Sequence, residues 1–202
     1  MSKPKWTIKR VLQTSLLFLV LVALPLGSWF YLQGGLDYRM EALAELEDMG
    51  PIPMFEWVDQ DGEAFDKDKC IGNLLIAGFL PFGEDREEYI NRMNKLHDQF
   101  DNRTDVYFLT FVPTSLKQVL HEPDARQDVQ QWKWVQIPDD QIEAVAATYA
   151  IPSNEKSALW ITLVDDKGAI RKHYHYQDNK EMGRLVEHMA MLLPNSVPRK
   201  VQ

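Results

Sequence analysis

The sequence contains one cysteine, Cys70, among its 202 residues. A single cysteine excludes an internal disulfide, a redox-active cysteine pair and any metal site built from several thiolates. The chain has five histidines, and only His173 and His175 stand at a spacing that suggests a shared ligand. The chain therefore lacks most of the side chains on which thiol redox proteins and transition-metal proteins depend.

Charge is absent from the stretch between Val11 and Leu32, and no acidic residue precedes it. A helix of 22 residues is about 33 Å long, which is enough to cross a bilayer core of about 30 Å. A cleaved signal peptide is the alternative, but its apolar region is usually shorter and a small-residue cleavage site follows it. In this sequence Gly27 and Ser28 lie inside the run. We therefore predict an uncleaved transmembrane helix over residues 11–32.

The basic residues of the N-terminus indicate the orientation of this helix. Residues 1–10 carry four basic side chains and no acid, and positive flanks stay on the cytoplasmic side. We expect a cytoplasmic tail over residues 1–10 and a single-pass protein of the bacterial inner (cytoplasmic) membrane, with its C-terminal domain in the periplasm. Low cysteine usage is compatible with either compartment.

Positive charge is also in deficit beyond the apolar run. Four of the 22 basic residues precede the run and all 30 acidic residues follow it, so the exported part has a net charge of −12. A surface of that sign argues against nucleic acid or an anionic lipid surface as the partner. It is compatible with a basic protein partner, although an acidic surface often serves solubility alone.

Glycine and proline pairs divide the remainder of the chain. Gly34-Gly35 is expected to end the membrane helix, and Gly50-Pro51 to end a short amphipathic helix over Asp37 to Met49. These signals predict a juxtamembrane connector helix within residues 33–50, a globular domain over residues 51–194, and a C-terminal tail over residues 195–202.

Apolar runs and helical spacing alternate through the globular domain. An Asp-Gly turn between apolar segments predicts a hairpin, and near-continuous apolar runs predict strands buried on both faces. The expected strands are Met54–Val58, Ala64–Phe65, Leu74–Leu80, Val106–Val112, Trp132–Ile137, Ala158–Val164 and Ala169–Tyr176, and the expected helices are Glu84–Phe100, Leu116–Val129 with an interruption at Pro123, Asp139–Tyr149 and Asp178–Leu193.

This order predicts an α/β fold. Strands joined through a helix are most often parallel, and the last strand, which enters through a tight turn, must be antiparallel to the strand before it. The layout is that of a thioredoxin-like domain with an N-terminal β-hairpin, preceded by a single transmembrane helix.

The loop after the first buried strand is the expected place for chemistry, because open α/β sheets bind ligands at the ends of such strands. The residues of this loop are Pro81, Phe82, Gly83, Glu84, Asp85 and Arg86. None of them is a cysteine or another usual nucleophile. The loop has the position of an active site without the reactive groups.

The sequence resembles the Sco/SenC family, membrane-anchored thioredoxin-like proteins of cytochrome c oxidase assembly. The likeness runs from about Pro53 to Leu193. It rests on FEWVDQDGEAF before the first buried strand, LLIAGFLPF at that strand, VYFLTFVP at the next and ALWITLVDDKGAIRKHY near the end. The resemblance implies the fold, and an association with respiratory-complex assembly.

The resemblance also implies where a copper and redox site should lie. The family needs two cysteines in a C-x-x-x-C segment and a histidine before the third strand, and these positions fall near Glu84, Glu88 and Ser157. Carboxylates and a hydroxyl are hard ligands that do not suit Cu(I). A thioredoxin would also have a proline near Ser157. We therefore expect no catalytic residue and no cofactor, and a non-catalytic accessory or scaffold role with a protein partner in oxidase assembly.

Three alternatives remain for single residues. Cys70 could serve a thiol oxidoreductase or peroxidase, or be an incidental small residue. His173 and His175 share one face of a strand and could hold a metal in a carrier, or they could lie on a solvated face. The acids from Glu84 to Glu88 could bind a hard cation or act as acid and base, or they could simply favour the start of a helix.

Overall fold

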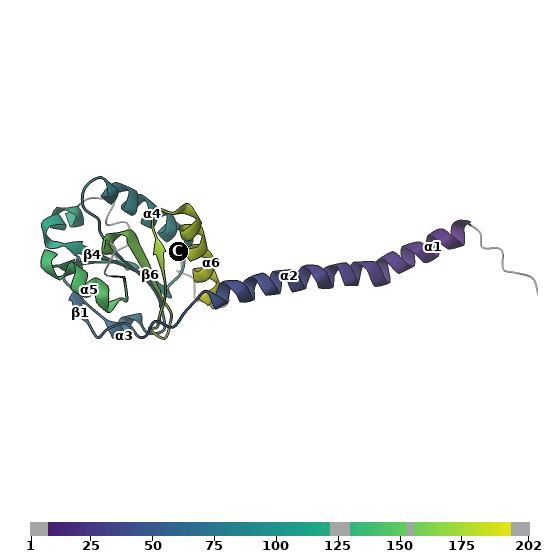
Figure 1. Ribbon diagram of the computed structural model, residues 1–202, viewed down its shortest axis with the longest axis horizontal. Helices are drawn as coiled ribbons and strands as arrows, with labels where there is room; N and C mark the ends of the chain where they lie inside the picture. The colour runs from purple at the N-terminus through teal and green to yellow at the C-terminus, as the bar shows by residue number, and fades with distance from the viewer. Residues whose placement is uncertain (1–7, 122–129, 153–155, 195–202) are drawn as a thin grey trace, which may run out of the picture. The chain divides into compact units, whose positions relative to one another are not determined.

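The computed structural model describes residues 8–121, 130–152 and 156–194. The chain forms two compact units, Met1–Glu45 and Leu46–Gln202 (Figure 1). The tails expected over residues 1–10 and 195–202 lie mostly or wholly outside the described residues, as does the second half of the helix expected over Leu116–Val129.

The first unit is helical throughout its described part. It consists of α1 (Ile8–Phe18), a π-helical segment η1 (Leu19–Ala23) and α2 (Leu24–Ala44). Within the described chain, Val11–Ala44 is the one helix that is long and apolar enough to cross a membrane, and signal sequences share these properties. Its large apolar side chains are exposed, which fits a lipid-facing anchor.

The helix does not end at Gly34-Gly35 as expected. α2 continues through both glycines to Ala44, because a glycine costs about 1 kcal/mol relative to alanine in a helix and its neighbours here favour the helix. The prediction of a separate connector helix that reaches Met49 was therefore wrong.

Residues 46–50 are instead bound to the edge of the sheet. The amide of Glu47 donates to the carbonyl of Arg171 at 3.0 Å, and the amide of Met49 donates to the carbonyl of Ile170 at 2.9 Å. The amide of Ile170 donates in return to the carbonyl of Gly50 at 2.8 Å. The globular unit consequently begins at Leu46, five residues before the expected boundary at Pro51.

A five-stranded sheet in the order β5-β4-β3-β6-β7 forms the centre of the globular unit. β3, β4 and β5 are parallel to one another, and β6 and β7 are antiparallel to their neighbours. The strands are β3 (Leu74–Phe79), β4 (Val106–Pro113), β5 (Trp132–Ile137), β6 (Trp160–Val164) and β7 (Ile170–His175). All residues of β3 are buried, which confirms the apolar run as a central strand.

The antiparallel direction of β6 departs from the usual rule for strands joined through a helix. The helix in this connection, α5 (Ile142–Thr148), has only seven residues and rises about 10 Å, half the length of a six-residue strand. It does not carry the chain back along the sheet. β6 therefore starts beside the end of β3, with Ile161 opposite Gly78.

The same aspartate turn builds two hairpins. β1 (Glu56–Val58) and β2 (Ala64–Asp66) pair as predicted, and Asp59 between them accepts hydrogen bonds from the amides of Asp61 and Glu63. Between β6 and β7, Asp165 accepts from the amides of Lys167 and Ala169. An aspartate that bonds its own turn favours this geometry without help from the rest of the fold.

The sheet is covered on both faces (Figure 1). On one face lie α4 (Asp85–Phe100) and α6 (Asn179–Leu192), where His97 packs on Phe108 and Tyr174 on His188. On the other face lie α5 and the hairpin, where Phe111 contacts both Trp57 and Tyr149. After β4 the chain forms a 3-10 helix, η2 (Thr114–His121), rather than the α-helix expected from Leu116.

Candidate functional site

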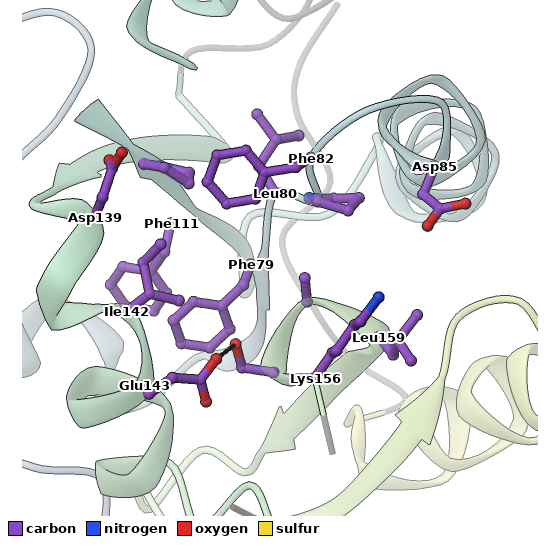
Figure 2. Close-up of a pocket in the computed structure, with 14 residues that line it drawn as sticks. Phe79, Leu80, Phe82, Asp85, Phe111, Asp139, Ile142, Glu143, Lys156 and Leu159 are labelled. Atoms are coloured by element: carbon purple, nitrogen blue, oxygen red, sulfur yellow. Dashed lines mark hydrogen bonds between the residues drawn. The ribbon is translucent and has the colours of Figure 1, made fainter. Parts of the chain in front are cut away.

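A pocket of about 350 Å³ opens where β3 and β4 end and β6 begins. Parallel strands expose their carboxyl ends there, and the short α5 returns the chain to the same end of the sheet. The pocket is lined by Phe79, Leu80, Pro81, Phe82, Asp85, Phe111, Pro113, Asp139, Ile142, Glu143, Lys156, Ser157, Ala158 and Leu159 (Figure 2).

The base of the pocket is aromatic and rigid. The rings of Phe79 and Phe111 stack with their centroids 4.9 Å apart, and both side chains are buried. Phe82, by contrast, is 54% exposed. Such an arrangement leaves apolar surface accessible beside a preformed core, which favours insertion of an apolar group.

Five charged or polar groups stand around this apolar base, and Asp85 at the start of α4 is one of them. The Ser157 hydroxyl donates to Oε1 of Glu143 at 2.9 Å, the bond drawn as a dashed line in Figure 2. Asp139 accepts from the Ser115 amide at 3.1 Å, and its bonds with Ser115 lower the pKa of its carboxyl. Asp139 is therefore ionised at neutral pH. Lys156 is the remaining group and the one cation among the lining residues.

The structure gathers four of the sequence-predicted loop and strand-entry residues in this pocket: Pro81, Phe82, Asp85 and Ser157. Gly83 forms the turn between them, and its φ of +74° is a conformation that glycine adopts without strain. These residues come from the end of β3, the start of α4 and the 3-10 helix η5 (Ser157–Leu159). The loop after β3, which lacks reactive groups, therefore contributes to a pocket.

Glu84 and Glu88 lie elsewhere. They border a polar groove with Arg92 and Lys95, and Glu88 forms an ion pair with Arg92 at 2.8 Å. Residues four apart share one face of a helix, whereas Asp85 points to another. The two glutamates and Ser157 are therefore not brought together as a ligand set.

Cys70 lies in the core. It is 1% exposed and its thiol donates to the carbonyl of Asp66 at 3.6 Å. Burial, together with the nearby Asp66 carboxylate, raises the pKa of the thiol to about 12. The reactive species of a cysteine is the thiolate, so this environment opposes thiol chemistry at neutral pH.

His173 and His175 lie on the same face of β7, as predicted. Nδ1 of His173 is 3.0 Å from the Thr162 hydroxyl, and burial lowers the pKa of its ring. The ring of His175 packs against Trp160 and Tyr176. No cluster of three histidine, cysteine, aspartate or glutamate side chains occurs within the described ranges, so a metal on this pair would need ligands from outside them.

Sequence reasoning missed Asp139, Glu143 and Lys156. The pattern around Asp139 predicts only a helix cap, and no motif surrounds the other two. The order and direction of the strands were the signal that could have identified them. The segments after β4, after β5 and before β6 all reach the end of the sheet where β3 stops.

The fold is thioredoxin-like, as comparison with solved structures shows. No protein-family model matches the sequence, and a search of the curated proteins found no match. A SCO1/SenC family lipoprotein from Bacillus anthracis is 19% identical with a TM-score of 0.61, covering 74% of this chain and 98% of that one. Other thioredoxin-like neighbours include a thiol-disulfide oxidoreductase domain from Bacteroides vulgatus.

Two further Sco proteins have similar structures. BsSco, described as a member of the Sco family of cytochrome c oxidase assembly proteins, is 17% identical with a TM-score of 0.52 over 70% of this chain and 92% of that one. Bradyrhizobium japonicum ScoI with copper bound is 10% identical with a TM-score of 0.53 over 71% and 100%.

Copper does not fit the residues that the family resemblance places at the copper site. Glu84, Glu88 and Ser157 offer hard oxygen donors, which suit Cu(I) poorly. The glutamates also face a groove different from the pocket that Ser157 lines. What the site offers is an apolar recess with an acidic rim.

Proposed function

We propose that this thioredoxin-like chain is a non-catalytic, membrane-anchored accessory or scaffold factor in cytochrome c oxidase assembly. The observation that carries the proposal is the pocket at the end of β3. It is an open recess above a buried aromatic base at the position where the fold carries its chemistry, while the residues there provide no thiol. A site that keeps its shape without its reactive groups suits binding.

The apolar N-terminal helix supports a membrane location. It fits a permanent anchor, with residues 1–10 in the cytoplasm, residues 11–32 within the inner membrane and the globular domain in the periplasm. A factor for a membrane-embedded respiratory complex gains from this placement, because an anchor confines it to the surface where its partner is assembled. The likeness to Sco proteins supports the same setting.

The enzymatic alternative is weaker on physical grounds. A peroxidase or oxidoreductase would depend on Cys70, which is buried in the core with a pKa raised to about 12. The thiolate fraction at pH 7 is then negligible. The metal-carrier alternative depends on His173 and His175, and the described residues place no third histidine, cysteine or carboxylate with this pair in a group that could hold a metal ion.

The test is genetic and spectroscopic. Deletion of the gene should reduce two measured quantities in membranes: the haem absorbance of assembled cytochrome c oxidase and its enzymatic activity. The wild-type gene and Cys70→Ala should both restore the oxidase, whereas the domain without residues 1–44 should restore it poorly. Alanine is chosen at position 70 because it adds no polar group to the core.

The decisive comparison is made at equal amounts of protein, measured by immunoblot of membrane fractions for the full-length variants and of whole cells for the domain without residues 1–44. If deletion leaves the oxidase unchanged, the assembly role is wrong. If Cys70→Ala accumulates normally but fails to restore the oxidase, the protein acts through its thiol and the non-catalytic proposal gives way to an enzyme.

A further inference from the structure

We infer that the pocket at the end of β3 binds a partner segment in which one large apolar side chain stands next to a lysine or arginine. This inference rests on the proposed function and specifies the chemistry of its partner. It concerns a protein segment rather than a small cofactor, because the pocket volume of about 350 Å³ is near the lower end for ligand sites.

The apolar part of the inference follows from Phe82 and the base beneath it. Phe82 exposes 54% of its surface at the rim of a recess lined by Phe79, Phe111 and Ile142 (Figure 2). An aromatic or leucine side chain placed there would cover Phe82 and would itself be removed from water. Burial of such a side chain is the usual anchor of a protein interface.

The basic part follows from the imbalance of charge around the recess. Asp85, Asp139 and Glu143 carry three carboxylates and Lys156 carries the one cation among the lining residues. Figure 2 shows Asp85 and Asp139 on opposite sides of the pocket. A cation beside the apolar anchor can approach either carboxylate, whereas an acidic neighbour would be repelled.

Binding by strand addition is disfavoured, because the outer edges of the sheet are already capped. On β5, the Gln60 side chain accepts from the Trp134 amide at 2.8 Å and donates to the Trp132 carbonyl at 3.2 Å. On β7, the Glu181 carboxylate accepts from the His175 amide at 2.6 Å, and residues 47–50 occupy the other end. A partner must therefore use side chains rather than backbone pairing.

The experiment uses the full chain in nanodiscs of zwitterionic lipid and a fluorescein-labelled probe, the acetylated and amidated peptide Gly-Lys-Phe-Arg-Gly. Binding is followed by fluorescence anisotropy against empty nanodiscs. We expect saturable binding that weakens at least fivefold when glycine replaces the phenylalanine, or when glutamates replace both basic residues. The Kd should also rise between 50 and 500 mM salt, because exposed ion pairs are screened.

Variants locate the binding. Asp85→Asn and Asp139→Asn should each raise the Kd about twofold to fivefold, the effect of one exposed ion pair, and Phe82→Ser should raise it further. Asp98→Asn is the matched control, because Asp98 is 71% exposed and lies 13 residues along α4 from Asp85, about 20 Å. Each variant is first checked for an unchanged circular dichroism spectrum.

The inference is overturned if the glutamate peptide binds as tightly as the basic one, if no saturable binding occurs, or if Asp98→Asn weakens binding as much as the pocket variants. Its failure is distinct from failure of the proposed function. Absent peptide binding together with an oxidase defect on deletion refutes the pocket chemistry alone, whereas peptide binding without an oxidase defect supports the pocket and refutes the assembly role.

Discussion

Gly78 is the position where a single methyl group should have the clearest effect on stability. It lies in the middle of β3, opposite Thr110 of β4. A Cβ atom at this position would lie 2.4 Å from the hydroxyl oxygen of Tyr89 and 3.3 Å from two of its ring carbons. Tyr89 is fully buried and its hydroxyl is 3.3 Å from that of Thr110, so the ring has no free space to enter.

The expected cost of Gly78→Ala combines three contributions. Overpacking costs about 1–3 kcal/mol, and displacement of the Tyr89 hydroxyl from Thr110 costs about 1 kcal/mol. Replacing a glycine inside a strand returns roughly 0.5–1 kcal/mol. The net loss in the free energy of unfolding is about 1–3 kcal/mol, which corresponds to a fall in Tm of roughly 2–12 °C for a domain of this size.

The assay is urea and thermal unfolding of the full chain in mild detergent, followed by circular dichroism. Tyr89→Phe removes the hydroxyl oxygen that the new Cβ would meet, so Gly78→Ala should cost much less in that background, with a coupling of at least about 1 kcal/mol in the double-mutant cycle. Gly183→Ala is the matched control. No atom lies within 4 Å of its added Cβ in α6, and it should stabilise the helix by up to about 1 kcal/mol.

Two results would refute this reasoning. Gly78→Ala with wild-type stability would mean that Tyr89 does not pack against β3 as described. An equal cost of Gly78→Ala in the wild-type background and in the Tyr89→Phe background would mean that some contact other than the hydroxyl group causes the loss.

Four further predictions concern other parts of the chain. Cys70 should resist thiol-labelling reagents at pH 8 in the folded protein and react rapidly in urea, because it is buried and its pKa is raised; rapid native labelling would restore the enzymatic alternative. Asp59 is partly desolvated, but its bond to Lys133 and the turn amides lower its pKa below the ordinary 3.8. The free energy of unfolding of wild type should therefore exceed that of Asp59→Asn. This difference should be full above pH 4 and should shrink as the pH falls through the folded pKa of Asp59. A difference that does not change with pH would contradict the prediction. A chain that starts at Leu46 should be more stable than one that starts at Pro51, because the shorter chain loses three backbone hydrogen bonds to β7; equal urea midpoints would contradict this. The full chain should not take Cu(I) from a competing chelator, since its site offers oxygen donors. If the chain does take copper, loss of that copper in the double variant His173→Ala with His175→Ala would assign the metal to the histidine pair.

The fold could be predicted from the sequence because its main signals are local. The apolar runs at Leu74 and Val106, the Asp-Gly turn after Asp59 and the cap at Asp178 each specify an element without reference to the rest of the chain. The helix end predicted at Gly34-Gly35 was wrong for the opposite reason. A glycine weakens a helix by a small amount, and the continuous helix shows that the helix-favouring neighbours outweighed this cost.

The rim of the pocket could be predicted only in part. Asp85 was identified from its place after the first buried strand and Ser157 from the family resemblance alone, but the bond from Ser157 to Glu143 joins residues 14 apart on two elements. Their meeting depends on α5 being too short to reverse the chain, and on the resulting antiparallel direction of β6. Glu84 and Glu88 were included by counting along the chain, whereas helical phase directs them into a separate groove.

Residues 47–50 have a consequence for the fate of the protein after proteolysis. They occupy the edge of β7 at Ile170 and Arg171, so the segment that follows the N-terminal apolar helix is also part of the sheet. Cleavage before Leu46 would release an intact domain. Cleavage after Gly50 would leave unpaired amide and carbonyl groups on β7, and exposed strand edges of this kind recruit other chains. We expect the first fragment to remain monomeric in size-exclusion chromatography and the second to self-associate, so that the site of cleavage decides between a soluble domain and an aggregate.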